Sequence, residues 1–99
     1  MKVFISQPMR DLDNDEIIRV RSEAIEKIKE MYKDTDIEVI DSFFKDAPVT
    51  AKPLWYLADS LKLMSEADLV VFCKGYETAR GCLIEKRCAD DYQYNTVLL

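Results

Sequence analysis

The chain has 99 residues, of which 48% are hydrophobic and 33% are charged, and it carries only two glycines and three prolines. This length suffices for a single domain over residues 1–99 with one core, and the composition excludes a disordered or fibrous protein. The net charge of -5 argues against a nucleic-acid polymer as partner, because binding to a phosphate backbone needs a basic stripe that the sequence lacks.

The first half of the chain predicts a strand, a helix and a second strand. Residues 2–6 form a short apolar run that is typical of a buried strand. Asp13, with Glu16 three residues later, has the pattern of a capping box, and apolar residues at spacings of three and four follow as far as Tyr32. This pattern indicates an amphipathic helix. The apolar run at 37–40 predicts the second strand.

The second half of the chain repeats this alternation twice. Pro53 suits the first position of a predicted helix over 53–65, whose inner face is apolar. Residues 69–72 are apolar without alternation, which is typical of a strand covered on both faces. A last helix is predicted over 81–92, and a last strand over 96–99.

Strands that alternate with helices in this way require parallel pairing with right-handed crossovers. The sequence therefore predicts an α/β fold of the flavodoxin-like or Rossmann-like three-layer type, with a parallel sheet of four or five strands. In such sheets, ligands bind beyond the carboxyl ends of the strands, where the strand order switches direction. We expect the loops after the first three strands and the start of the last helix to meet there.

Several kinds of chemistry are excluded by what the sequence lacks. It has no histidine, which removes His-based triads and HExxH metalloenzymes. Its cysteines, Cys73, Cys82 and Cys88, show no CxxC pairing, so we expect reduced, mostly buried thiols and neither a metal nor a cofactor. The apolar runs are far shorter than a membrane span and the chain opens directly into a strand, which predicts a cytoplasmic protein without a membrane partner.

Glu85 is the most informative candidate for catalysis. The residues at helical spacing from it are Gly81, Cys82, Cys88 and Ala89, so no basic side chain is placed to form an ion pair within the helix. A carboxylate on this stripe of small residues would face the packed side of the helix. There the positive helix terminus favours the charged form and burial opposes it. The alternatives are an ion pair with a distant arginine and a position in solvent.

Several segments carry a resemblance to a known family. They are Phe4-Ile-Ser-Gln-Pro-Met9, Ser65-Glu-Ala-Asp68 with the strand after it, Gly75-Tyr76, and Arg80-Gly81-Cys-Leu-Ile-Glu85-Lys-Arg-Cys-Ala89. On these segments the sequence resembles the nucleoside 2-deoxyribosyltransferase-like superfamily over nearly the whole chain, and within it the small bacterial and phage members. The most specific parts are the loop after the first strand and the Gly-x-x-x-Glu start of the last helix.

The resemblance implies an enzyme that acts on an N-glycosidic bond. In that superfamily the glutamate of Gly-x-x-x-Glu, here Glu85, attacks C1′ of a 2-deoxyribosyl group and releases the base. Water in a hydrolase, or a second base in a transferase, then resolves the sugar ester. The implied ligand is a 2-deoxynucleoside or its 5′-monophosphate. A homo-oligomer is implied as well, and its interface candidates are Trp55, Tyr56, Tyr92 and Tyr94.

Further residues are placed around the ligand by the same resemblance. Either Asp59 or Ser60 contacts the sugar, since only one of the two can face the pocket. Tyr76 is expected to take the place of an orienting tyrosine on the first strand, where this chain has Val3 or Phe4. The candidates for ligand binding are Ser6, Gln7, Pro8, Met9, Arg10, Asp41, Phe44, Gly75, Arg80, Gly81 and Cys82. Stacking on the base and binding of a 5′-phosphate at the helix start would be their main contributions.

Three alternatives stay open at this point. Arg10 and Arg80 also fit plain surface charges, and Phe44 also fits a core or dimer contact. Two residues favour a catalytically inactive nucleotide-binding module of the same fold. Val3 lies near the position of the family's orienting tyrosine, and Ala79 stands where the transferases have an aspartate before the nucleophile. A structural domain with no small-molecule site is the third alternative.

Overall fold

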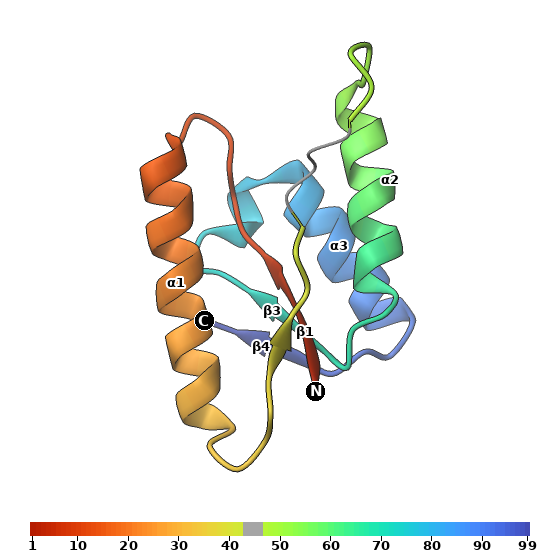
Figure 1. Cartoon of the computed structure of the whole chain (residues 1–99). Helices are drawn as coiled ribbons and strands as arrows, with labels where there is room; N and C mark the ends of the chain where they lie inside the picture. Colours follow the sequence, from red (N-terminus) through yellow and green to blue (C-terminus); the bar gives the residue numbers. More distant parts are fainter. Residues whose placement is uncertain (43–46) are drawn as a thin grey trace.

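The computed structural model describes residues 1–42 and 47–99. Its strands are β1 (Lys2–Ser6), β2 (Glu38–Val39), β3 (Leu69–Phe72) and β4 (Thr96–Leu98). Its helices are α1 (Asn14–Met31), α2 (Pro53–Met64), the single 3-10 turn η1 (Tyr76–Thr78) and α3 (Arg80–Asp91). In the described ranges the strands form one four-stranded, entirely parallel sheet (Figure 1). The predicted α/β fold is confirmed, with four strands.

The strand order is β2-β1-β3-β4, in which β1 lies between the two strands that follow it in the chain. The flavodoxin-like order of doubly wound sheets begins in the same way. The chain moves from β1 to one side through α1, and then crosses over β1 through α2 to reach β3. The order therefore switches direction between β1 and β3, where Ser6 is in register with Phe72.

Helices cover both faces of the sheet (Figure 1). On one face α1 packs against alternate strand residues, and this core is formed by Val3, Ile5, Ala24, Ile28, Leu69, Val71 and Cys73. On the other face α2 and α3 pack against the remaining residues, and this core is formed by Phe4, Met64, Val70, Phe72 and Ala89. Every residue of β3 is buried, as its unalternated apolar run predicts for a strand covered on both faces.

The three helices begin in different ways. The side chain of Asp13 accepts a hydrogen bond from the Glu16 amide at 2.8 Å, so the predicted cap of α1 is confirmed. α2 begins at Pro53 after Lys52, and α3 begins after Ala79, and neither of them has a side-chain cap. None of the helices in the described part of the chain is long and apolar enough to cross a membrane.

Candidate functional site

A cleft of about 1190 Å³ opens beyond the carboxyl end of β1. Its walls are the loop after β1, Ser42 after β2, the first half of α2 and the start of α3. Figure 1 shows the end of β1 and the starts of α2 and α3 at the same end of the molecule. The cleft therefore lies on the side of the sheet that the strand order indicates for a ligand.

Glu85 lies in the wall of this cleft, on the second turn of α3, with only 7% of its surface exposed. Its Oε1 accepts a hydrogen bond from the hydroxyl of Ser6 at 2.7 Å. Cys82 and Ala89, on the same stripe of the helix, are buried as well. The carboxylate therefore takes neither alternative position: it is not in solvent, and it forms no ion pair with a described residue.

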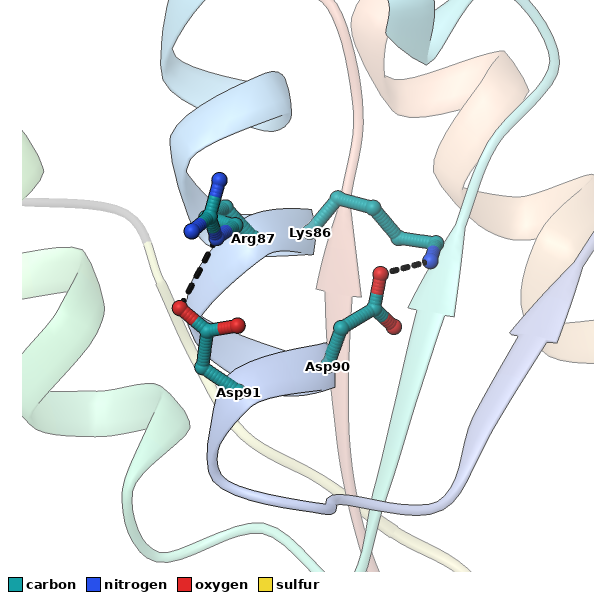
Figure 2. A network of polar contacts seen from close by, with 4 residues as sticks. All are labelled: Lys86, Arg87, Asp90 and Asp91. Atoms are coloured by element: carbon teal, nitrogen blue, oxygen red, sulfur yellow. Dashed lines mark hydrogen bonds and ion pairs between the residues drawn. The ribbon is translucent and has the colours of Figure 1, made fainter.

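The two basic residues that follow Glu85 in the sequence form ion pairs within α3. Figure 2 shows Lys86 paired with Asp90 and Arg87 paired with Asp91, each one turn further along α3. Both pairs have the helical spacing at which opposite charges meet on one face. These cations are therefore satisfied within the helix, and the charge of Glu85 is left without a neutralising partner among the described residues.

Burial controls the ionisation of Glu85 and Cys82 in the cleft. It raises the pKa of Glu85, and the hydrogen bond from Ser6 partly opposes this effect. Burial also raises the pKa of Cys82 to about 11, although Ser6 again acts in the opposite direction. Cys82 is therefore a thiol at neutral pH and a poor nucleophile. The carboxylate of Glu85 is the better candidate for attack on a ligand.

The raised pKa of Glu85 predicts that this residue costs stability at neutral pH. The folded protein holds the proton of Glu85 more tightly than the unfolded chain does. The contribution of Glu85 to the free energy of unfolding is therefore at its maximum below the ordinary pKa of 4.5. It falls as pH rises through the pKa that Glu85 has in the folded state. We expect Glu85→Gln, which keeps an acceptor for Ser6, to be more stable than the unmodified protein at pH 7. The difference should close below about pH 4.5.

Urea unfolding between pH 4 and pH 8 measures this difference directly. Glu77→Gln is a suitable control, because Glu77 is exposed on η1 and outside the cleft. A stability difference for Glu85→Gln that is constant over this pH range, or that grows toward low pH, would contradict the prediction.

Most of the predicted site residues line the cleft. Of the two alternatives on α2, Ser60 lines the cleft and its neighbour Asp59 does not. The rotation of α2 about its axis therefore turns the hydroxyl, and not the carboxylate, toward the site. The predicted residues in the lining are Ser6, Gln7, Pro8, Met9, Arg10, Ser60, Arg80, Gly81, Cys82 and Glu85. The loop after β1 and the start of α3, which carry the resemblance most specifically, are therefore brought together.

Other predicted residues lie elsewhere. The ring of Tyr76 packs against Phe72 at 5.4 Å between centroids, and Tyr76 is not part of the cleft lining. Gly75 adopts a left-handed conformation, with φ of 89°, in the turn before η1, and it does not line the cleft either. Asp41 is exposed beside Ser42 and is also absent from the lining. Phe44 lies outside the described residues.

The aromatic candidates for an interface between subunits differ in their surroundings. Tyr56 lines the cleft. The ring of Trp55 packs edge to face against the ring of Tyr56, with 5.2 Å between the ring centroids. Tyr94 is half-buried, and its hydroxyl donates to the carbonyl of Ser65 at 2.9 Å. Tyr92 at the end of α3 is 77% exposed. Among these four, Tyr92 presents most of its surface for contact with another molecule.

The features that were not predicted from the sequence include Lys52 in the cleft and Arg21 beside it. Lys52 lines the cleft at the start of α2, a position for which the preceding sequence gives no signal. Arg21 of α1 is buried, and it donates to the carbonyl of Ile40 at 2.9 Å and to the hydroxyl of Ser42 at 3.4 Å. Arg21 occupies the same helical stripe as the buried Ile17 and could have been found from that spacing. It holds the segment after β2 against α1.

Comparison of the chain with protein-family models, with curated proteins and with solved structures found no match.

Proposed function

We propose that this protein cleaves or transfers at the N-glycosidic bond of a 2-deoxynucleoside or its 5′-monophosphate, with Glu85 as the nucleophile. One observation carries the proposal. The carboxyl group of Glu85 lies in the wall of the cleft, held by the Ser6 hydroxyl at 2.7 Å and without an ion pair to a described residue. A carboxylate that is oriented but not neutralised is suited to form a covalent bond with an anomeric carbon.

The reaction would proceed in two displacements at C1′. A carboxylate oxygen of Glu85 forms a bond to C1′ while the bond from C1′ to the base nitrogen breaks, and the bonding electrons leave with the base. Water, or a second base, then attacks C1′ as the ester bond breaks, which frees the carboxylate. The attacking group loses one proton and the departed base gains one, so the protons balance through the solvent. Because formation of the ester removes a buried negative charge, the burial that raises the pKa of Glu85 also favours the first step. Ser6 keeps the carboxylate in place, and Ser60, which lines the same cleft, would bind the sugar.

The charges of the cleft favour the 5′-monophosphate over the free nucleoside. Three cations line it, Arg10, Lys52 and Arg80, against the two acidic residues Asp11 and Glu85, whereas the chain as a whole has a net charge of -5. The first residues of α2 and α3 line the cleft. Neither helix has a side-chain cap or an acidic residue in its first turn. Uncapped helix amides together with cations favour an anionic group. By contrast, the first turn of α1 is capped and acidic.

The experiment that tests the proposal is incubation with the four common 2-deoxynucleosides and their 5′-monophosphates, with free base followed by chromatography. We expect base release, and faster release from the monophosphates. Ligand binding without base release in the unmodified protein would contradict the enzymatic proposal and support the second candidate, an inactive nucleotide-binding module. That candidate is favoured by Ala79, which lines the cleft. The methyl side chain of an alanine cannot donate a proton to a departing base.

Lys52 and Arg80 provide a test of phosphate binding. We expect Lys52→Ala and Arg80→Ala each to weaken binding of a deoxynucleoside 5′-monophosphate by about tenfold, because each removes a charge-assisted contact. Binding of the uncharged nucleoside should change little. Titration calorimetry at low and high salt measures both, and the loss should shrink as salt screens the charges. Lys62→Ala, on α2 but outside the cleft lining, is the matched control. Equal losses for all three variants would contradict a phosphate site at the helix starts.

A further inference from the structure

The two oxygens of the Glu85 carboxylate have different surroundings. Oε1 accepts the hydrogen bond from the Ser6 hydroxyl at 2.7 Å, and no described residue donates to Oε2. Among the described residues, the one side-chain nitrogen or oxygen that is fully enclosed without a partner is Oε1 of Gln7. Oε2 of Glu85 therefore keeps some accessible surface. Because Glu85 lines the cleft and is otherwise buried, this surface opens into the cleft.

Ser6 is held firmly enough to fix the carboxylate. It is the last residue of β1, it is 2% exposed, and it is in register with Phe72 of β3. Its carbonyl accepts from the amide of Cys73 at 2.9 Å. A charged carboxylate has no proton to give, so the single proton of the hydroxyl points toward Glu85. Without this bond the carboxylate could rotate, because the last torsion of a glutamate side chain has broad, two-fold minima.

We infer that Ser6 is a positioning residue for the reaction, which holds Oε1 of Glu85 so that Oε2 is the oxygen that attacks C1′. The inference rests on the proposed function, because it takes Glu85 as the nucleophile. A lone pair of Oε2 forms the bond to C1′ while the bond from C1′ to the base nitrogen breaks and its electrons leave with the base. Oε1 becomes the carbonyl oxygen of the ester and still accepts from Ser6, which keeps its proton throughout. The second displacement returns the bonding electrons to Oε2.

The same hydrogen bond gives a signature in the pH dependence of the reaction. It stabilises the charged carboxylate, so its loss should raise the pKa of Glu85 further above the ordinary value. Because attack needs the charged form, the acid limb of kcat/KM should then move to higher pH. The other titratable groups that line the cleft are Arg10 and Asp11 after β1, Lys52 and Tyr56 on the side of α2, and Arg80 and Cys82 on α3. None of them changes when the hydroxyl is removed, so the shift belongs to Ser6.

A series of variants at Ser6 tests this inference. Ser6→Cys nearly keeps the volume and leaves a weak donor, a thiol that is neutral in the acid range, whereas Ser6→Ala removes the donor. Ser22→Ala is the matched control, because Ser22 is exposed on α1 and outside the cleft. The substrate is whichever of dAMP, dCMP, dGMP and dTMP the unmodified protein cleaves fastest. Base release between pH 4 and pH 8 gives kcat and KM, and urea unfolding shows whether each variant is folded.

We expect the acid limb of kcat/KM to move to higher pH by about one pH unit in Ser6→Ala, and by less in Ser6→Cys. At pH values above the limb, kcat should fall by about tenfold to a hundredfold with KM nearly unchanged, because the carboxylate is misplaced while the ligand contacts are kept. Ser22→Ala should change neither quantity. If Ser6 has only a structural role, its variants will lose stability while the limb stays in place, and the inference is overturned.

A second measurement does not depend on turnover. In protein labelled with carbon-13 glutamate, the side-chain carboxyl signal that is missing from Glu85→Gln reports the titration of Glu85 directly. It should titrate at higher pH in Ser6→Ala than in the unmodified protein, and an unchanged or lower pH overturns the inference. A shifted titration without any base release contradicts the proposed function alone, so the two failures are distinguishable. If Ser6→Ala does not fold, Ser6→Cys gives the same two readouts.

Discussion

Replacement of Glu85 by glutamine is expected to lower base release by at least about a thousandfold, because an amide cannot act as the nucleophile that forms the sugar ester. The substitution keeps the size of the side chain and an oxygen that can accept from Ser6, so the cleft should keep its shape. We therefore expect the Kd for a deoxynucleotide to change much less than the rate. Chromatography of free base and titration calorimetry measure the two quantities separately.

The controls for this prediction separate chemistry from folding. Glu77→Gln removes an exposed carboxylate outside the cleft and should leave the rate unchanged. Glu85→Gln is also expected to be more stable than the unmodified protein at pH 7, so unfolding cannot explain a loss of activity. In the unmodified protein, intact-mass measurement after rapid acid quench should detect a covalent sugar adduct, and the variant should show none. Base release by Glu85→Gln at the unmodified rate would remove Glu85 from the mechanism.

The fold could be predicted from the sequence because its signals are local. The cap at Asp13, the proline at the start of α2 and the apolar run of β3 each act within a few residues of the chain. The position of Glu85 was predictable for the same reason, since residues three and four positions away fix which side of α3 it occupies. The alternation of strands and helices then indicated the end of the sheet at which Glu85 lies.

The rest of the site depends on how separate elements pack, which spacing along the chain does not specify. Lys52 reaches the cleft because the starts of α2 and α3 line the same cavity. The choice between Asp59 and Ser60 depends on the rotation of α2 about its axis, and Tyr76 packs on Phe72 because η1 turns it toward the core. Whether the buried oxygen of Gln7 finds a hydrogen-bond partner depends on the positions of single atoms, and no sequence pattern indicates that it has none among the described residues.

Phe72→Ala is expected to lower the free energy of unfolding by about 3–5 kcal/mol, the usual cost of a phenylalanine truncated in a core. Phe72 has no exposed surface, and it packs in the core beneath α2 and α3 together with Tyr76. A domain of this size has about 5–15 kcal/mol in total, so the variant would lose a large part of its stability. Urea unfolding at pH 7 measures the loss, and a lower urea midpoint without a change in slope would show that the native state alone was weakened.

Leu98→Ala is the matched control, because Leu98 is the register partner of Phe72 on β4 and yet is 55% exposed. Its truncation leaves no enclosed cavity, and we expect a cost of about 1 kcal/mol or less. The contrast between two paired residues tests burial rather than strand pairing as the source of stability. Phe72 is also in register with Ser6, which orients Glu85, so the same variant should weaken nucleotide binding even at temperatures where it remains folded. Equal losses of stability in the two variants would show that the core on this face of the sheet is not closed around Phe72.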